Sequence, residues 1–222
     1  MSIYSDLSVI PESADDLKSI VTTAKMMRLK ILGVPWSLVR EPTCSEGVLL
    51  LPRHAVKAST RREARKGLDN APKEALVVVE ALETDAARYA AVNKRVDVLR
   101  IPPDKPGLVD RSTARLFRER GWGLVELSLS EVKRNLEALR PLAIAARRAV
   151  AYSIPFTVVS DARDYMDLWH PRAAAALLEV VGVPWKEALS ALTTYPLSSI
   201  MRRSSFKKVL RSCLAPRTGA TS

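Results

Sequence analysis

The stretch ALVVVEALETDAARYAAVNKRVDVLRI, residues 75–101, contains the pattern that decides the fold. It starts with the run Ala75–Val79, which is apolar at every position, as in parallel strands that are buried on both faces. Thr84–Asn93 has the composition of a helix, and Val96–Ile101 is a second strand-like run. We therefore predict a strand, a helix and a strand in succession, the unit from which parallel sheets are built.

The same alternation continues on both sides of this stretch. Trp122–Leu129 alternates cleanly, with Glu126 and Ser128 on the face opposite Val125 and Leu127, so it is a predicted strand. Helices with capping signals separate the strands, because Ser13 precedes one helix and Asp110 and Gly121 flank another. The other predicted strands are Tyr4–Val9, Lys30–Val34, Gly47–Leu51 and Phe156–Ser160.

About seven strands alternating with helices predict a parallel sheet with right-handed crossovers, either doubly wound or closed as a barrel. Periodicity does not choose between the two. The chain has only eight Gly and neither a G-x-G-x-x-G nor a Walker sequence, which disfavours a doubly wound nucleotide-binding domain.

The charge of the chain points to a polyanionic partner. Its 222 residues suit one domain, and 35 Lys and Arg against 24 Asp and Glu give a net charge of +11. The surplus is clustered, most densely in residues 53–66 and in the C-terminal segment. Such clusters attract nucleic acid by counterion release, whereas an evenly solvated basic surface is the alternative.

Composition also disfavours several classes of protein. No apolar run approaches the roughly 20 residues that span a bilayer, and the N-terminus lacks the pattern of a secretory signal. Cys44 and Cys213 are far apart in sequence, so neither a disulfide framework nor a thiolate metal site is predicted. We expect a cytoplasmic protein with no membrane partner.

Metal and nucleophile chemistry have few candidate residues. The only two histidines, His54 and His170, cannot form a His-rich metal site, and surface or helix-capping roles are predicted for them. There is no G-x-S-x-G sequence and thus no sign of a serine triad.

Three acidic residues on or near predicted strands remain. Asp6, Glu80 and Glu126 could bind Mg²⁺ together. The favoured interpretation is that a charged barrel interior pairs these acids with arginines such as Arg100.

The two ends of the chain are expected to differ. Residues 1–203 are predicted to form a single barrel domain, and residues 204–222 a basic, flexible tail that can be removed without unfolding it. Trp169, beside His170 and Arg172, is a candidate for stacking on RNA, whereas Trp122 and Trp185 are predicted to pack in the core.

Several stretches, in their order and spacing, resemble one known family. They are Asn93–Leu99, Val109–Arg111, Trp122–Leu129, Pro155–Ala162 and Asp167–Arg172. The sequence resembles ribonuclease P protein component three, the archaeal counterpart of the thirty-kilodalton eukaryotic subunit. The resemblance extends over nearly the whole chain and is clearest between residues 93 and 201.

The resemblance implies a TIM-type α/β barrel, similar to the polymerase and histidinol phosphatase superfamily but without its metal site. Metal enzymes of that superfamily would be expected to carry a His where this chain has Ser8. The implied role is an accessory subunit of an endoribonuclease, with no cofactor bound by the protein and no activity of the protein alone. The RNA subunit would use Mg²⁺ to remove the 5′ leader from precursor tRNA.

The resemblance also implies partners and contact residues. The partners are ribonuclease P RNA, precursor tRNA and a small ferredoxin-like protein subunit in a two-plus-two heterotetramer. Trp169 stands where the family would carry an Arg. The implied RNA-binding residues are Lys94, Arg95, Arg111, Arg163 and Arg172, with Ser160 shaping the strand end beneath them. The basic cluster near the C-terminus adds Arg202 and Arg203 as predicted RNA-binding residues.

Two other functions stay open at this point. A metal-dependent phosphoesterase of the related superfamily would use Asp6, Glu80 and Glu126 and would cleave RNA without an RNA subunit. An unrelated barrel that binds structured RNA as a scaffold would show RNA affinity without an effect on tRNA maturation.

Overall fold

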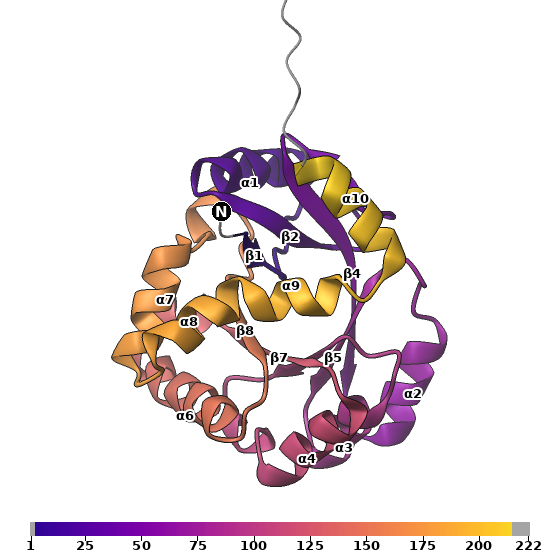
Figure 1. The fold of residues 1–222 in the computed structure, drawn as a ribbon, viewed down its shortest axis with the longest axis vertical. Helices are drawn as coiled ribbons and strands as arrows, with labels where there is room; N and C mark the ends of the chain where they lie inside the picture. The colour runs from indigo at the N-terminus through magenta and orange to yellow at the C-terminus, as the bar shows by residue number, and fades with distance from the viewer. Residues whose placement is uncertain (1–2, 215–222) are drawn as a thin grey trace, which may run out of the picture.

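The computed structural model describes residues 3–214, and its centre is a nearly closed barrel of seven parallel strands (Figure 1). Each parallel strand pairs with the next one along the chain. Because a doubly wound sheet reverses its strand order at a switch point, the predicted barrel is confirmed. The strands are β1 (Tyr4–Asp6), β2 (Leu29–Pro35), β4 (Val48–Ala58), β5 (Leu76–Ala81), β6 (Val98–Ile101), β7 (Leu124–Ser128) and β8 (Phe156–Val159), and β3 (Thr43–Ser45) pairs antiparallel with β4.

The first and last strands of the barrel meet just beyond their carboxyl ends. The Ile10 N–H donates to the Ala162 carbonyl at 2.7 Å, and the Asp161 N–H donates to the Ser8 carbonyl at 2.9 Å. Val9 and Ala162 form a parallel bridge between these two segments. The barrel is thus joined between β1 and β8 at the end where such folds carry their functional groups.

Helices connect the strands and surround the barrel (Figure 1). The predicted caps form, because Ser13 accepts from the Asp16 N–H at 3.1 Å, Asp110 accepts from the Thr113 N–H at 2.6 Å, and Gly121 ends its helix at a φ of 77°. Among residues 3–214, no helix has the length and apolarity needed to cross a membrane. The helices are α1 (Ala14–Met26), α2 (Arg61–Asp69), α3 (Thr84–Val92), η1 (Pro106–Leu108), α4 (Arg111–Arg120), α5 (Ser130–Arg134), η2 (Leu136–Ala138), α6 (Leu139–Ala151), η3 (Tyr165–Asp167), α7 (Pro171–Val180), α8 (Trp185–Leu192), α9 (Thr194–Ile200) and α10 (Ser204–Leu214).

The interior of the barrel is an apolar core of its own. Alternate strand residues point inward, so Leu49 and Leu51 of β4 lie inside, whereas Leu50 packs with the outer layer around α1. Helices α9 and α10 cover the opening at the amino ends of the strands (Figure 1). Their Ile200 and Phe206 are fully buried in the same cluster as the inward-facing leucines.

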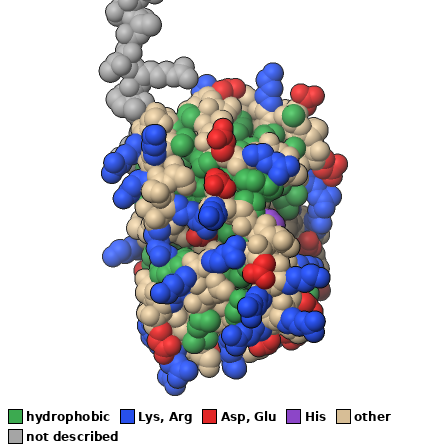
Figure 2. Space-filling view, turned by 90° about the vertical axis from the view of Figure 1, so that its right-hand side faces the viewer, with side chains coloured by type: hydrophobic (Ala, Val, Ile, Leu, Met, Phe, Trp, Pro, Cys, Tyr) green, Lys and Arg blue, Asp and Glu red, His purple; other side chains and the backbone are tan. Residues whose placement is uncertain are grey.

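The basic surplus lies on the outside of the molecule. Figure 2 shows Lys and Arg side chains spread over the face that carries α2 and α10. The exposed cations of these two helices are Arg61, Arg62, Arg65, Lys66, Lys208 and Arg211. The clusters predicted from the sequence therefore place positive charge on the exposed sides of α2 and α10.

The C-terminal segment differs from its prediction. Residues 204–214 form helix α10 rather than a flexible tail, and Phe206 and Leu210 on one side of it are buried. The domain boundary expected at residue 203 is therefore wrong for this helix. Its apolar stripe is hidden in the sequence among Lys and Arg residues. The remainder of the expected tail, residues 215–222, lies outside the described residues.

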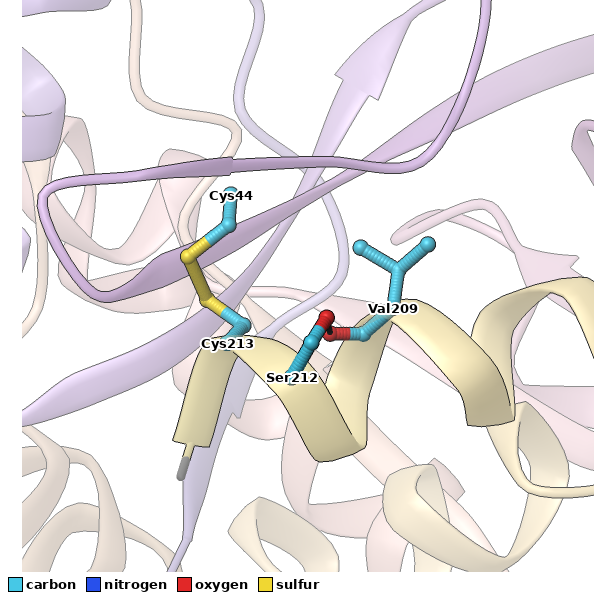
Figure 3. Close-up of a disulfide and its surroundings, with 4 residues drawn as sticks. All are labelled: Cys44, Val209, Ser212 and Cys213. Carbon is cyan, nitrogen blue, oxygen red and sulfur yellow. Dashed lines mark hydrogen bonds between the residues drawn. A yellow bond between two sulfur atoms is a disulfide. The ribbon is translucent and has the colours of Figure 1, made fainter. Parts of the chain in front are cut away.

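A disulfide joins α10 to the β3–β4 hairpin (Figure 3). Cys44 of β3 and Cys213 of α10 have their Cα atoms 5.5 Å apart, although 169 positions separate them in sequence. The prediction of no disulfide is wrong, because sequence spacing carries no information about contacts that only the closed barrel creates.

Candidate functional site

A row of alternating charges lines the carboxyl end of the barrel interior. Glu80 of β5, Arg100 of β6 and Glu126 of β7 are direct cross-strand neighbours. They follow the inward-facing apolar residues at a spacing of two, so the strand alternation that builds the core also points these charged side chains inward. The Arg100 Nη1 lies 3.1 Å from a Glu126 oxygen, and its Nε lies 3.7 Å from Glu80.

A second arginine binds Glu126 from β4. The Arg53 guanidinium donates to both Glu126 carboxylate oxygens, each at 2.6 Å, and to the Leu7 carbonyl at 2.7 Å. Both side chains of this pair are buried. A bidentate arginine with a further carbonyl partner satisfies the charge and most donors of the pair away from water.

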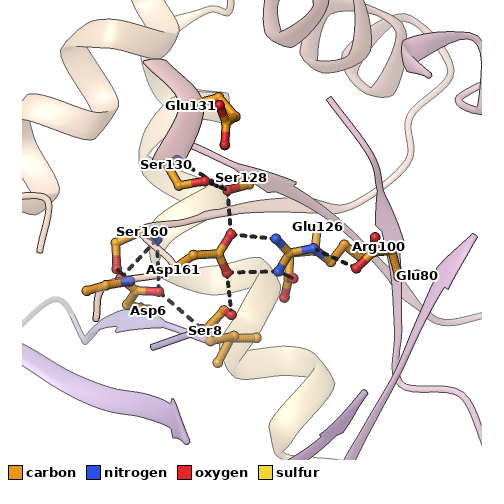
Figure 4. A network of polar contacts seen from close by, with 12 residues as sticks. Asp6, Ser8, Glu80, Arg100, Glu126, Ser128, Ser130, Glu131, Ser160 and Asp161 are labelled. Carbon is orange, nitrogen blue, oxygen red and sulfur yellow. Dashed lines mark hydrogen bonds and ion pairs between the residues drawn. The ribbon is translucent and has the colours of Figure 1, made fainter. Parts of the chain in front are cut away.

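Asp161, just after β8, completes the network (Figure 4). It accepts from the Arg100 Nη1 and Nη2 at 2.8 and 2.5 Å, and from the hydroxyls of Ser8 and Ser128 at 2.6 and 2.5 Å. Burial alone would raise the pKa of Asp161, but the hydrogen bonds and charge of Arg100, with the two serine hydroxyls, lower it below its ordinary value.

Asp6 has the opposite electrostatic environment. Burial raises the pKa of this carboxyl to about 7, although the backbone N–H groups of Ser8 and Ser160 donate to it at 3.2 Å. No arginine contacts it within the described part of the chain. Asp6 therefore carries a proton over much of the acidic range and joins the ends of β1 and β8 by hydrogen bonds.

The arrangement does not suit a divalent cation. The interpretation that the strand acids pair with arginines is confirmed for Glu80 and Glu126, which both lie beside Arg100, and is wrong for Asp6, which is held by hydrogen bonds from Ser8 and Ser160. Within residues 3–214, no three His, Cys, Asp or Glu side chains are grouped so that they could hold a metal. Ser8, at the position where a His was expected in metal enzymes of this fold, donates to Asp161 instead. The phosphoesterase alternative is not supported.

The mouth of the barrel is hollow above this network. A cavity of about 260 Å³ is bounded by Ser8, Val9, Ile10, Pro35, Arg53, Ala55, Glu80 and Arg100. Its charged walls are already paired, Arg100 with Glu80 and Arg53 with Glu126. The network can hold the barrel end rigid, but it presents neither an unpaired carboxylate nor an activated nucleophile to a substrate.

The predicted RNA-contact residues fall into two groups, one at each end of the barrel. Four lie at the carboxyl end, because helices that follow parallel strands start there. Arg111 begins α4, Arg172 lies in the first turn of α7 and Arg163 follows β8, and all three are exposed. Ser160 is buried; its N–H donates to Asp6 and its Oγ accepts from the Ala162 N–H.

The residues around Arg172 partly follow the sequence interpretation. His170 caps α7 as predicted, since its Nδ1 accepts from the Arg172 N–H at 3.2 Å. Trp169 is half-buried, and its indole N–H has no hydrogen-bond partner among residues 3–214. The Lys133 ammonium lies 5.8 Å from the Trp169 ring. Stacking of Trp169 on RNA stays a prediction.

The other group lies at the amino end of the barrel. Lys94 and Arg95 are exposed in the loop before β6, and Arg202 and Arg203 connect α9 to α10. Arg203 is bound to the buried Asp97, with its Nε and Nη2 at 3.1 and 2.5 Å from the carboxylate. Burial raises the pKa of Asp97, and Arg203 counteracts that shift. No single surface can therefore carry all eight predicted residues.

Sequence reasoning missed several residues of the charged network. Arg53 was not expected on a strand, because the third predicted strand ended at Leu51, whereas β4 continues to Ala58. Extending the alternation Leu49, Leu51 by one step would have placed Arg53 inside. Asp161 has no comparable signal, because it follows its strand and has a left-handed φ of 51°.

Three comparisons with known proteins agree with one another. The model of the family described as RNase P subunit p30 matches residues 3–208. Ribonuclease P protein component 3 of Aeropyrum pernix is 35% identical over 191 residues, covering 83% of this chain and 90% of that protein. Its counterpart from Methanosarcina mazei is 33% identical over 120 residues, covering 52% of this chain and 50% of that protein.

A solved structure has the same fold. One chain of a cryo-EM structure of archaeal ribonuclease P with mature tRNA superposes with a TM-score of 0.66, covering 89% of this chain and 93% of its own length. The two sequences are 16% identical, so this likeness bears on the fold alone.

Proposed function

Since the chain belongs to the RNase P subunit p30 family, we propose that it is the protein subunit of ribonuclease P that supports an RNA subunit in removing the 5′ leader of precursor tRNA. The observation that carries this proposal is the charged row at the carboxyl end of the barrel. Enzymes with this fold place their reactive groups there. In this chain the acids of that row are bound to Arg53 and Arg100.

That pairing supports a division of labour between the RNA and the protein. The RNA subunit would perform the cleavage with its own Mg²⁺, and the protein would bind no cofactor. The contribution of the protein is then electrostatic and structural, because cations on a rigid barrel neutralise phosphates and hold RNA segments in place. The net charge of +11 supports this role.

The partners are part of the proposal. They are ribonuclease P RNA, precursor tRNA and a small ferredoxin-like protein subunit, in a two-plus-two heterotetramer. The expected compartment is the cytoplasm, where precursor tRNA would be processed. Archaeal relatives named ribonuclease P protein component 3 support an assembly of the archaeal type.

The test is cleavage of precursor tRNA by ribonuclease P RNA at moderate Mg²⁺, with and without this protein and its small partner. We expect the protein to accelerate cleavage or lower the Mg²⁺ requirement only when the RNA subunit is present. Cleavage by the protein alone, lost in Asp6→Asn, would move the chemistry into the barrel. RNA binding without any stimulation would instead indicate an RNA-binding scaffold with another role.

A further inference from the structure

Trp122, just after the cap of α4, lies between two arginines. The Cζ of Arg120 is 4.0 Å from the indole centroid, and the Cζ of Arg202 is 3.3 Å from the same ring. Two guanidinium groups this close to one centroid cannot share a face of the ring without overlapping. The three side chains therefore form a stack of planar groups, cation on aromatic on cation, at the amino end of the barrel.

The inner arginine of this stack is fixed by the backbone. The Arg120 Nη1 donates to the carbonyls of Ala90 and Asn93 at 2.9 and 2.8 Å, and its Nε donates to the Trp122 carbonyl at 2.8 Å. Its Nη2 is buried without a partner among the described residues. Burial, followed by the charge of Arg202, lowers the pKa of Arg120 to about 10. Among the described residues, no carboxylate makes an ion pair with Arg120 or Arg202, although the charge of Asp97 acts on both from nearby.

The outer arginine has unused binding capacity. Within residues 3–214, the Arg202 side chain makes neither an ion pair nor a hydrogen bond, and it is exposed. Its neighbour Arg203 is already bound to Asp97 and to the Lys73 carbonyl. One face of the Arg202 guanidinium rests on the indole, so the other face and the in-plane N–H groups are open to a ligand.

A cavity of about 280 Å³ lies beside the stack. It is bounded by Phe117, Arg118, Gly121, Trp122, Gly123, Ser153 and Pro155. Its volume is near the lower end of small-ligand pockets, which start at roughly 300 Å³. Gly123 allows the side chains of Phe117 and Arg120 to pack against the backbone beside Trp122, because a Cβ at position 123 would lie 2.1 Å from Phe117 and from the Arg120 Nη2. Arg118 adds an exposed cation to an otherwise apolar or neutral lining.

We propose that this cluster is a binding site for one unpaired nucleotide of an RNA chain, with the base stacked on Arg202 and the adjoining sugar-phosphate in the cavity beside Trp122 and Arg118. Unpaired bases stack on aromatic rings and on guanidinium planes, and phosphates take the cations beside them. A ligand that carries only a carboxylate would use the positive charge of the arginines but would gain nothing from the planar stack, whereas the base of a nucleotide uses both. The proposal rests on the proposed function for the identity of the polymer.

The site is separate from the group formed by Arg111, Arg163 and Arg172. Those residues lie at the carboxyl end of the barrel, whereas Trp122 and Arg202 lie at the amino end. The subunit would consequently contact RNA at both ends of its barrel, by phosphate contacts at one end and by base stacking at the other.

The test compares two probes on the full chain, without the RNA subunit. Fluorescence anisotropy measures the affinity for labelled oligoadenylate and for an abasic ribose-phosphate oligomer of equal length. We expect oligoadenylate to bind about ten-fold tighter. Arg202→Lys keeps the charge but not the planar face, so it should abolish this preference and leave the abasic affinity within about two-fold. The matched control is Arg211→Lys, an exposed cation on α10 outside the stack, which should retain the preference.

Two results would overturn the site: equal binding of both probes by the unaltered chain, or a full base preference in Arg202→Lys. Arg202→Gln provides a second variant, and thermal melting of each variant checks that it is folded. If the unaltered chain does not stimulate cleavage of precursor tRNA but prefers oligoadenylate through Arg202, the proposed function is wrong and the nucleotide site stands. If it stimulates cleavage but its preference for oligoadenylate does not depend on Arg202, the proposed function stands and the nucleotide site is wrong.

Discussion

The guanidinium of Arg53 and the carboxylate of Glu126 form a two-point ion pair inside the barrel, with both oxygen–nitrogen distances at 2.6 Å and no exposed surface on Glu126. Their strands, β4 and β7, are not neighbours in the barrel, so the pair crosses its interior. Together with Arg100, it links β4, β6 and β7 through Glu126 at the carboxyl end of the barrel.

Removing one partner of this pair should be more harmful than removing both charges. Arg53→Met leaves Glu126 buried with one fewer cation, and we expect a loss of about 3–5 kcal/mol in the free energy of unfolding. Arg53→Met combined with Glu126→Gln should recover much of that loss. Urea unfolding of the original chain, the single variant and the double variant measures both effects, and equal losses in the two variants would contradict the expected recovery.

Asp6 should make the folded state less stable as pH rises. Its pKa is about 7 in the folded protein against 3.8 for an ordinary Asp, so the folded state retains a proton that the unfolded state releases in this window. This effect of Asp6 on the free energy of unfolding is absent below pH 3.8. Between pH 3.8 and pH 7 it lowers the free energy of unfolding by about 1.4 kcal/mol per pH unit. Asp6→Asn should therefore flatten the decline in stability between these values. An unchanged pH profile of unfolding in Asp6→Asn would contradict the raised pKa.

Arg172 should contribute to RNA binding without contributing to stability. It is exposed, and among residues 3–214 only its backbone N–H donates a hydrogen bond, to His170. Arg172→Ala should weaken binding to ribonuclease P RNA and reduce the slope of log affinity against log salt by about one, because one phosphate contact releases about one counterion. Arg115→Ala on α4, whose arginine is paired with Glu119, is the matched control. An unchanged slope would argue against a phosphate contact at Arg172.

Helix α10 should be required for a closed core. Deleting residues 204–222 removes Phe206 and Leu210 from the barrel interior, and we expect loss of cooperative thermal melting. Deleting only residues 215–222 leaves every contact of α10 described above in place and should preserve the transition. Identical melting of the two truncated chains would mean that α10 is dispensable.

The disulfide should add to the stability provided by α10. Cys213→Ser opens a covalent loop between positions 169 apart, and the loss of the cross-link should lower the free energy of unfolding by up to about 5 kcal/mol under oxidising conditions. A reducing agent should bring the original chain down to the level of Cys213→Ser. No difference between the oxidised and reduced original chain would show that the cross-link contributes nothing.

The sequence was sufficient for the helix caps and for the barrel strands other than the second half of β4, because these depend on local patterns. Glu126 was placed correctly opposite Val125 by a spacing of two residues alone, and Ser13 and Asp110 cap the helices that they precede. The pairing of Glu80 and Glu126 with Arg100 was also predictable, since a buried carboxylate is stabilised by a neighbouring cation, whereas Asp6 is buried without an arginine and did not follow this expectation.

What the sequence could not supply depends on contacts between distant segments. Cys44 meets Cys213 only after the barrel has closed, and Arg203 meets Asp97 across 106 positions. For the same reason, a list of basic residues could not reveal that Arg172 and Arg202 lie at opposite ends of the molecule. Trp122 was assigned to the core because it opens a strand, whereas its two arginine neighbours come from helix ends that only the fold brings together.

The cover over the amino end of the barrel sets a condition on biosynthesis. Leu7, just beyond β1, and Phe206 and Leu210 of α10 belong to the same apolar cluster, although nearly all of the described chain separates them. A nascent chain therefore cannot complete this cluster until α10 has been synthesised, however early its strands pair. A chain that stops before α10 would lack the cover and should be degraded by quality-control proteases, so assembly of the particle would draw only on subunits that include α10.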